Sequence, residues 1–574
     1  GCPRLRGFVS GDARSFVRVT CGSYNAIGDS WMGASVSTDL LEGLNAAQRE
    51  AVTHGDGPLL VIAGAGTGKT RTLAARVAYL ISQGVPAERI LLLTFTRRAA
   101  AEMIARAGQL TDRSSAGRVW GGTFHSVANR LLRMYARPMG LPADFTVMDQ
   151  GDAGDLMNII RNELGVAKKD RRFPRKETLV AIYSRTVNAE QKLREVLERQ
   201  YPWCLDDYEG IREILREYVK RKREQNVLDY DDLLLYWNEL CETPGLGDTV
   251  ASRFDHILVD EYQDTNAVQA RILQGMRRTN RNLMVVGDDA QSIYSFRAAT
   301  VRNILDFPKQ FPGARIVTLE QNYRSTEAIL KVSNLVMEGA RERYTKNLWS
   351  GRTSGPKPVL VTVMDEPEQA VEVCRRIVSF YEQGIPLIRQ AVLFRAGYHS
   401  DQLEVELARR KLPFHKYGGL KFIEAAHVKD LLALLRILEN PYDEISWFRV
   451  LLLLDGIGPQ SARRIIDELG VRAGGAADGS PHRRLIERPP KVPPAAAEQF
   501  RQLRSTILQC VAYSPSGGLI ESGGAPRAAD EAPWNDPEAE VESARAAHEP
   551  PLAVQIERIR RFYDPIFNKR YDNP

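Results

Sequence analysis

The sequence predicts an α/β protein with parallel sheets and two inserted helical subdomains. Three observations support this fold class. Short apolar runs are each followed by turn residues and a helical pattern, which is the order of elements in a parallel sheet. A glycine-rich phosphate-loop pattern follows the first run. A long stretch with helical periodicity and many charges separates the second run from the third.

The apolar runs have the length and flanking residues of buried strands. They are Leu59–Ala63, Ile90–Thr94, Ile257–Asp260, Leu283–Gly287, Ile316–Leu319 and Ala391–Phe394. The helical patterns predict helices at Thr72–Ile81, Asp430–Leu438, Ile445–Leu454 and Gln460–Leu469. Two stretches are rich in glycine, alanine, proline and acidic residues, so we expect loops at Gly470–Ala497 and Ser514–Pro551.

At 574 residues the chain is too long for one hydrophobic core. The predicted division is an unstructured or extraneous extension at 1–38, a first sheet domain at 39–148 and 248–317, its helical insertion at 149–247, a partial second sheet domain at 318–430, and a helical insertion with loops at 431–574. The extension is inferred from the patternless first 31 residues, which precede Met32.

Composition and charge limit the partners, metal sites and location that we expect for this chain. Lys and Arg exceed Asp and Glu by 78 to 72, too little to indicate a nucleic acid partner. Basic clusters at 168–176 and 220–223 are either local DNA-binding surfaces or solvated helix faces. The six cysteines form no CxxC pair, so no zinc or iron–sulfur site is expected. No apolar run could span a membrane and no signal peptide is recognised, which favours a cytoplasmic protein.

The strongest local pattern lies between the first predicted strand and its helix. Small residues there would let backbone N–H groups and the helix N-terminus approach phosphates, while Lys69 would neutralise charge and the Thr70 hydroxyl would bind Mg²⁺. The residues of this Walker A loop are Ala63, Gly64, Ala65, Gly66, Thr67, Gly68, Lys69 and Thr70. The strand-to-helix context makes the pattern specific, so it predicts nucleotide binding.

A pair of carboxylates ends the predicted strand Ile257–Asp260, where an α/β sheet places its ligand site. Asp260 is expected to hold Mg²⁺, and Glu261 is expected to orient and deprotonate the attacking water. Read alone, such a pair is more often a helix cap. An upstream phosphate loop makes the catalytic interpretation more specific.

Several segments, in this order and spacing, resemble the motifs of superfamily 1 DNA helicases of the UvrD/PcrA/Rep group. They are 44–48 for the Q motif, 94–96 with 99–103 for motif Ia, 122–126 for motif Ib, 260–266 for motif II, 286–297 for motif III and 321–326 for motif IV. The resemblance covers about Leu41 to Leu469. It implies RecA-like P-loop NTPase domains that hydrolyse ATP, with Mg²⁺, in the cleft between them.

The resemblance also implies roles on the nucleotide side. Gln48 would recognise adenine through its amide, Tyr323 would stack on the base, and Arg71 would lie beside it. Gln291 and Arg324 would reach the γ-phosphate from the two sides of the cleft, with Arg324 as an arginine finger. The expected catalytic set is Lys69, Glu261, Gln291 and Arg324.

A row of aromatic residues is expected to face single-stranded DNA, because aromatic rings stack on bases of any identity. The residues expected to contact DNA in motifs Ia, Ib and III are Phe95, Thr96, Arg98, His125, Tyr294, Phe296 and Arg297. For Phe95, packing in the core is an equally good interpretation. The sequence departs from the family at Arg97 and Arg98, where Asn-Lys is usual, and at Phe296, where Trp is common. We expect these changes to adjust DNA binding rather than abolish it.

Two later segments also resemble family elements. Gly456 and Gly458 lie in a Gly-Ile-Gly sequence like the one with which the family grips duplex DNA, since amides at a helix start can bind phosphate. A plain turn between helices is almost as good an interpretation. Residues Tyr417–Phe422 resemble the segment that closes the first part of the second motor domain.

The family's motif V, roughly Thr-Val-His-x-x-Lys-Gly-Leu-Glu, and motif VI, with Val-Ala-x-Thr-Arg, do not occur in the sequence. We therefore expect the motor to be incomplete in this chain. The intact motor would move 3′ to 5′ on single-stranded DNA and unwind duplex at single-strand/duplex junctions. It would act as a monomer or weak dimer, with repair proteins as partners, in DNA repair or replication restart. The alternatives are an ATP- and DNA-binding fragment without motor activity, or the helicase subunit of a RecB/AddA-type helicase–nuclease.

Overall fold

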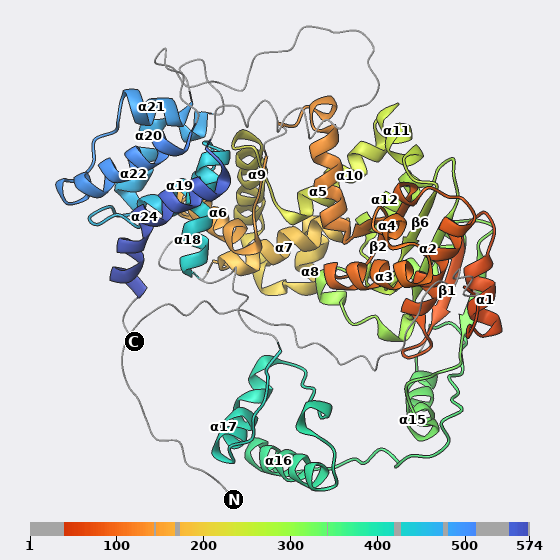
Figure 1. The fold of residues 1–574 in the computed structure, drawn as a ribbon. Coiled ribbons are helices and arrows are strands. Elements are labelled where there is room, and N and C mark those ends of the chain that lie inside the picture. The colour runs from red at the N-terminus through yellow and green to blue at the C-terminus, as the bar shows by residue number, and fades with distance from the viewer. Residues whose placement is uncertain are drawn as a thin grey trace, which may run out of the picture.

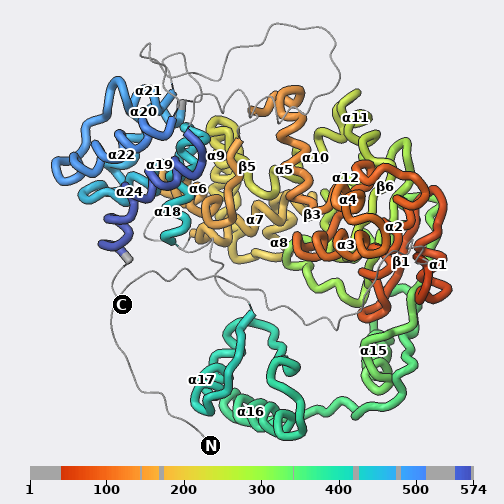
Figure 2. Tube along the Cα trace, in the orientation of Figure 1, coloured from red at the N-terminus to blue at the C-terminus, as the bar shows by residue number. Residues whose placement is uncertain are grey.

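The computed structural model describes residues 40–142, 145–166, 173–340, 342–417, 426–473, 480–511 and 550–571. The predicted extension at 1–38, the basic residues 168–172, the segment 418–422 and nearly all of the predicted loop at 514–551 lie outside these residues. Figures 1 and 2 show a sheet-bearing part, a group of helices beside it, and the helices α16 (Glu366–Glu382) and α17 (Asp401–Arg409) set apart from both.

The main sheet has six parallel strands in the order β3-β2-β6-β7-β1-β8. Its strands are β1 Leu59–Ala63, β2 Ile90–Leu93, β3 Trp120–Gly122, β6 His256–Val259, β7 Leu283–Gly287 and β8 Arg315–Leu319. In register, Leu60 of β1 lies opposite Val285 of β7 on one side and Ile316 of β8 on the other. The structure thus confirms the five strands predicted before residue 320. Strand β3 was not predicted, because its Trp-Gly-Gly sequence contains no apolar run.

Helices cover both faces of the sheet, which explains why β1, β2 and β7 are buried along their whole length. Along β1, Leu60 and Ile62 pack in one buried cluster, whereas Leu59 and Val61 pack in another. The helices of this part are α1 Ala46–Thr53, α2 Lys69–Ser82, α3 Arg97–Leu110, α4 Arg113–Ala116, α5 Phe124–Tyr135, α10 Tyr230–Glu242, α11 Leu246–Ser252, α12 Ala267–Met276, α13 Arg302–Leu305 and α14 Phe307–Gln310. The core is therefore a three-layer α/β sandwich.

The first helical insertion has its own apolar core. Its helices are α6 Gln150–Glu163, α7 Lys176–Asn188, α8 Leu193–Gln200 and α9 Tyr208–Glu224. A short parallel pair, β4 (Thr146–Val147) with β5 (Val227–Leu228), joins its two ends, although the sequence indicated no strand in this stretch.

Part of the basic cluster at 220–223 is structural, so neither interpretation given for that cluster holds for Lys222. The Lys222 ammonium is buried, with its Nζ 2.6 Å from Asp229 and 2.6 Å from Asp232. Arg221 pairs with Glu163 at 2.5 Å. These cations hold the insertion together, because an isolated buried charge would be strongly destabilising.

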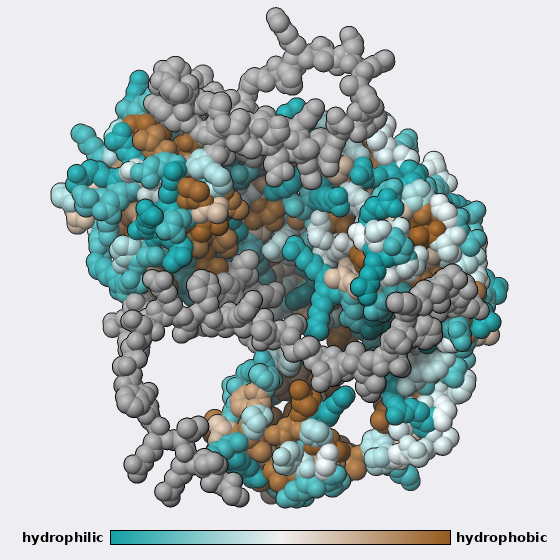
Figure 3. Space-filling view, in the orientation of Figure 1, coloured by the Kyte–Doolittle hydropathy of each residue, from teal (hydrophilic) through white to brown (hydrophobic). Residues whose placement is uncertain are grey.

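The strand predicted at Ala391–Phe394 is absent, and the described residues from 320 to 417 contain no strand of the length predicted there. A strand needs a hydrogen-bonded neighbour, and none of the described residues supplies one there. The apolar side chains are consequently exposed, to 94% for Leu393. Brown apolar surface is visible around α16 and α17 in Figure 3. The remaining helix of this domain is α15, Glu327–Glu338.

The second helical group forms a separate apolar core. Its helices are α18 Ala426–Glu439, α19 Glu444–Leu451, α20 Pro459–Leu469, α21 Pro481–Glu487, α22 Ala497–Cys510 and α24 Leu552–Tyr571. The structure confirms the helices predicted near 430, 445 and 460. The loop predicted at Gly470–Ala497 is wrong at α21, because Ser480 caps that helix and Leu485 is a buried apolar anchor.

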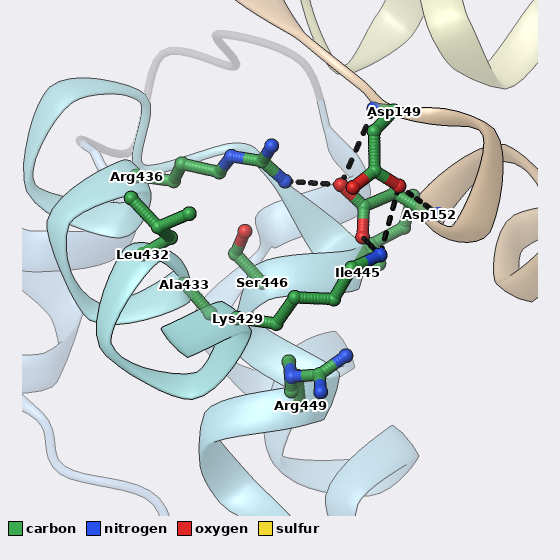
Figure 4. Close-up of a pocket in the computed structure, with 9 residues that line it drawn as sticks. All are labelled: Asp149, Asp152, Lys429, Leu432, Ala433, Arg436, Ile445, Ser446 and Arg449. Carbon is green, nitrogen blue, oxygen red and sulfur yellow. Dashed lines mark hydrogen bonds and ion pairs between the residues drawn. The ribbon is translucent and has the colours of Figure 1, made fainter. Parts of the chain in front are cut away.

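The two helical groups meet through ion pairs between α6 and α18 (Figure 4). The Lys429 ammonium lies 2.9 Å from Asp149 and 3.5 Å from Asp152, and Arg436 also pairs with Asp152. Asp149 and Asp152 form the capping box of α6, so helix capping and the contact between the groups use the same carboxylates. No helix in the described ranges is long and apolar enough to cross a bilayer.

Candidate nucleotide and DNA site

Three loops with polar residues leave the same edge of the sheet. They follow β1, β6 and β7, which lie side by side, and parallel strands end at one edge. The loop after β1 is the Walker A loop, the loop after β6 starts at Asp260, and the loop after β7 starts at Asp288. The topology therefore brings together residues that are distant in the sequence.

The Walker A loop turns sharply into α2. Gly66 and Gly68 have φ angles of 80° and 92°, a region that favours glycine, and Gly68 is the N-cap of the helix. The Thr67 hydroxyl donates to the carbonyl of Gly64 at 2.8 Å and closes the turn. Lys69 is the first residue of α2, and its Nζ lies 2.8 Å from Oε2 of Glu261. The loop lysine and the predicted base thus form an ion pair across the site.

Asp260 is a buried carboxylate whose Oδ1 atom has no hydrogen-bond partner among the described residues. Burial, and then the charge of Glu261, raise the pKa of Asp260 to about 7. Burial raises the pKa of Asp264 to about 6. An unsatisfied buried oxygen of this kind fits a divalent cation, which prefers oxygen ligands. Asp260 is therefore suited to hold a divalent cation, and Thr70 is the second residue of α2.

Glu261 is fixed in an unusual backbone conformation. Its φ angle is 50°, in the left-handed region that is costly for a residue with a side chain. Its carboxylate accepts a hydrogen bond from Nε2 of Gln263 at 2.9 Å, in addition to the Lys69 pair. These two contacts fix the position of the Glu261 carboxylate.

Gln48 supports the Walker A loop in addition to the role predicted from resemblance. Its Nε2 donates to the carbonyl of Thr67 at 2.9 Å, and its Oε1 accepts from the backbone N–H of Asn45 at 3.1 Å. The side chain is buried. The predicted contact between Gln48 and adenine would compete with these two hydrogen bonds. The predicted neighbour Arg71 donates to the carbonyl of Glu42 at 3.2 Å.

The predicted motif IV lies directly over the Walker A loop. Nδ2 of Asn322 donates to the carbonyl of Ala65 at 2.5 Å, and the backbone N–H of Tyr323 donates to that of Gly66 at 2.9 Å. The ring of Tyr323 and the side chain of Arg324 are exposed next to this contact. The sequence assigned no role to Asn322, because its partner is 257 positions away.

The loop after β7 holds the predicted γ-phosphate contact. Gln291 donates from Nε2 to Oδ2 of Asp288 at 2.6 Å. The backbone N–H of Asp288 donates to Oε1 of Gln263 at 2.9 Å. Because Gln263 also contacts Glu261, this loop and the loop after β6 form one hydrogen-bonded unit.

The predicted DNA-facing residues of two motifs form a continuous aromatic row. The ring centroids of Phe95 and Tyr294 are 4.7 Å apart, and those of Tyr294 and Phe296 are 5.8 Å apart. The Arg297 guanidinium lies 5.7 Å from the Phe296 ring. Phe95 and Phe296 are both exposed, so the core interpretation of Phe95 does not hold. Such a row suits stacking on bases.

His125 lies beside a second aromatic residue that the sequence did not indicate. Its ring is 5.8 Å, edge-on, from that of Tyr230, which is exposed at the start of α10. Burial lowers the pKa of His125 to about 4, so the imidazole is neutral near pH 7. Thr96 caps α3 by accepting from the N–H of Ala99, and Arg98 is exposed in the first turn of that helix.

The two glycines of the Gly-Ile-Gly element differ. Gly456 has a φ angle of 78°, and a Cβ there would lie 2.9 Å from Cβ of Ala495, so the fold itself requires glycine. Gly458 is the N-cap of α20, and a Cβ there would meet nothing within 4 Å. Of these two glycines, Gly456 is required by the fold, whereas no contact among the described residues explains why position 458 is glycine.

Comparison with known proteins identifies two matching family profiles. The UvrD/REP helicase N-terminal domain matches residues 44–312, and the UvrD-like helicase C-terminal domain matches residues 317–477. The chain is 36% identical over 430 residues to the ATP-dependent DNA helicase PcrA of Staphylococcus aureus. It is 35% identical over 431 residues to PcrA of Staphylococcus epidermidis. Each alignment covers 74% of this chain, which spans 58% of the length of these relatives.

Proposed function

The chain belongs to the UvrD/REP helicase family, and from this premise we propose that it is an ATP-driven DNA helicase that moves 3′ to 5′ along single-stranded DNA and opens duplex ahead of it. The observation that carries the proposal is the pairing of Lys69 with Glu261 beside Asp260, whose Oδ1 is buried and unpartnered among the described residues. An ammonium, a carboxylate and a buried, unpartnered carboxylate oxygen thus converge at the ligand edge of the sheet, which supports the roles of cation, base and metal ligand proposed for them.

In the proposed reaction, the Lys69 ammonium leaves its ion pair with Glu261 and binds the phosphates of ATP. Glu261 is then available to orient and deprotonate the attacking water, while Gln263 keeps its carboxylate in position. Mg²⁺, held by Asp260 and Thr70, would neutralise charge on the phosphate oxygens. Gln291 and Arg324 would stabilise the charge that develops on the γ-phosphate.

The second face of the proposed cleft is the segment over the Walker A loop. Asn322 and Tyr323 of this segment donate hydrogen bonds to carbonyls of the Walker A loop. A bound nucleotide would draw the N–H groups of the loop toward its phosphates and would thereby disturb these hydrogen bonds. Nucleotide binding would therefore alter how the segment over the Walker A loop meets the sheet domain, which is what a translocating motor requires.

On the DNA side, the row Phe95, Tyr294 and Phe296 would stack on successive bases of one strand. Binding would be tolerant of sequence and would weaken with salt. Single-stranded DNA and single-strand/duplex junctions are the proposed substrates, and repair proteins in the cytoplasm are the proposed partners.

The test separates nucleotide binding from chemistry. Lys69→Ala should weaken ATP binding and abolish hydrolysis, because phosphate loses its cation. Glu261→Gln should bind ATP at least as well as the unchanged protein and hydrolyse it at least about 100-fold more slowly. Lys309→Ala is the matched control, since Lys309 is an exposed lysine paired with Asp306. DNA-stimulated phosphate release and nucleotide binding are measured side by side.

In proteins that also carry motifs V and VI, equal and measurable turnover in all four would rule out the assigned site. A strand-displacement assay with a protein extended through motifs V and VI then tests direction on duplexes with a 3′ or a 5′ tail, and opening of only the 5′-tailed substrate would contradict the proposed polarity.

A further inference from the structure

Lys346 lies between α15 and α16, in a segment that returns to the loop after β7. Its Nζ pairs with the carboxylates of Asp288 and Asp289, and lies 2.5 Å from Oδ1 of Asp289. The exposed fractions of the three side chains are 8% for Lys346, 4% for Asp288 and 2% for Asp289. One lysine from outside the loop therefore neutralises two adjacent buried carboxylates.

The surrounding contacts show that this segment is anchored to the sheet domain. The backbone N–H of Tyr344 donates to Oδ2 of Asp289 at 3.1 Å, and the Tyr344 hydroxyl donates to the carbonyl of Ile304 at 3.2 Å. Two adjacent buried carboxylates repel each other, so without Lys346 the loop after β7 would lose the cation that holds these two side chains together.

Asp288 connects this lysine to the proposed γ-phosphate contact. One carboxylate oxygen of Asp288 accepts from Lys346, and the other accepts from Nε2 of Gln291 at 2.6 Å. A primary amide has two N–H donors, so one remains for a phosphate oxygen. The rotamer that presents this donor depends on where the Asp288 carboxylate is held.

We propose that Lys346 is a positioning residue for γ-phosphate recognition, acting through Asp288 on Gln291. The inference rests on the proposed function of the nucleotide site. Lys346 lies outside the first sheet domain but contacts its loop after β7. The segment before α16 would therefore respond to whether ATP or ADP is bound. In the proposed site the Walker A loop would bind the other phosphates without using Lys346, so ADP binding should not depend on Lys346.

The decisive measurement is discrimination between nucleotides. Dissociation constants for ADP and for a non-hydrolysable ATP analogue are measured in the 574-residue chain and in its Lys346→Met, Gln291→Ala and doubly substituted variants. Lys346→Met should weaken the analogue by roughly tenfold, as expected for one lost charge-assisted contact, and leave ADP within about twofold. The double variant should be no weaker than Gln291→Ala alone, because both changes remove the same interaction.

Controls separate positioning from general damage. Lys309→Met replaces an exposed lysine of the first sheet domain and should change neither constant. Lys346→Arg keeps the positive charge and should retain discrimination to within about threefold. If Lys346→Met does not fold, Lys346→Gln takes its place, because its amide can still donate to one carboxylate.

The outcomes are distinct. Equal weakening of ADP and the analogue, or additive effects of the Lys346 and Gln291 changes, overturns the inference and leaves the proposed function standing. Unchanged discrimination in folded Lys346→Met or Lys346→Gln does the same. Failure of the unchanged chain to bind either nucleotide overturns the proposed function and, with it, this inference.

Discussion

At the scale of single residues, Phe296 presents the most exposed ring of the aromatic row, with 66% of its surface accessible. Phe296→Ala should weaken binding of single-stranded DNA by about 1–3 kcal/mol, because stacking on a base is lost. Ile293→Ala is the control, since Ile293 lies in the same loop with 68% exposure and has no aromatic face. Fluorescence anisotropy with oligonucleotides of different sequence measures both. Equal losses for the two variants would contradict stacking.

Gly66 combines two reasons for having no side chain. Its φ angle is 80°, and a Cβ there would lie 2.7 Å from Cβ of Arg324. Gly66→Ala should therefore displace motif IV from the Walker A loop and weaken nucleotide binding at least about tenfold. Gly84→Ala carries similar backbone strain, at a φ of 87°, but meets nothing within 4 Å.

Thermal unfolding and nucleotide titration distinguish the two glycines. Gly84→Ala should cost only about 1 kcal/mol of stability and leave binding intact. Equal nucleotide binding by both variants would show that the close contact between Gly66 and motif IV does not affect nucleotide binding.

The residues of the candidate site were predictable where a local pattern carries the chemistry, as in the Walker A loop and Asp260–Glu261. Their partners were not. Lys69 meets Glu261 because β1 and β6 end at one edge of the sheet, and Asn322 meets Ala65 across 257 positions. Tyr230 was missed because an exposed aromatic at a helix start has no distinctive signal in one sequence.

At the scale of secondary structure elements, α21 contains a buried histidine. Burial lowers the pKa of His482 to about 4, and its Nε2 has no hydrogen-bond partner in the described part of the chain. The folded pKa lies below the unfolded value, so stability is full above about pH 6.5 and falls as the pH drops toward 4. At pH 5 the loss is about 2 kcal/mol.

His482→Leu should therefore raise the melting temperature at pH 5 more than at pH 7. Leu485→Val, in the same helix, changes packing without a titrating group and should shift both temperatures alike. Calorimetric melting at the two pH values measures the difference. A shift for His482→Leu that is independent of pH would show that proton binding at this site does not limit stability.

Elements were predictable from the sequence when their own residues decide the structure. Strands β1, β2 and β7 are buried on both faces and therefore apolar, and the helices have clear periodicity. The strand expected at Ala391–Phe394 failed because a strand also needs a neighbour, which no local pattern reveals. Helix α21 was hidden in a stretch whose composition, rich in glycine and proline, outweighed the short apolar anchor at Leu485.

At the scale of the whole molecule, Asp152 links the two helical groups through Lys429 and Arg436 (Figure 4). Asp152→Asn keeps a capping side chain for α6 but removes the charge. It should accelerate hydrogen exchange in α18 and α19 by roughly tenfold, because two partly buried cations lose a partner.

Asp155→Asn is the matched control. Asp155 is on the same helix but pairs with Lys176 inside the first insertion, so exchange in α18 should not change. Faster exchange in both variants would indicate a general weakening of α6 rather than a specific connection between the helical groups.

The exposed apolar segments around residues 360 and 393 should affect the solubility of the protein and its tendency to self-associate. Leu360 and Leu393 are exposed in a part of the chain without hydrogen-bonded strand neighbours among the described residues. Unpaired extended segments with apolar side chains adhere to one another and to chaperones and hydrophobic dyes. We expect light scattering to rise with protein concentration and with added sulfate, and a dye such as anilinonaphthalene sulfonate to fluoresce on binding. The same surface should decide how concentrated a stock can be kept and which additives preserve it.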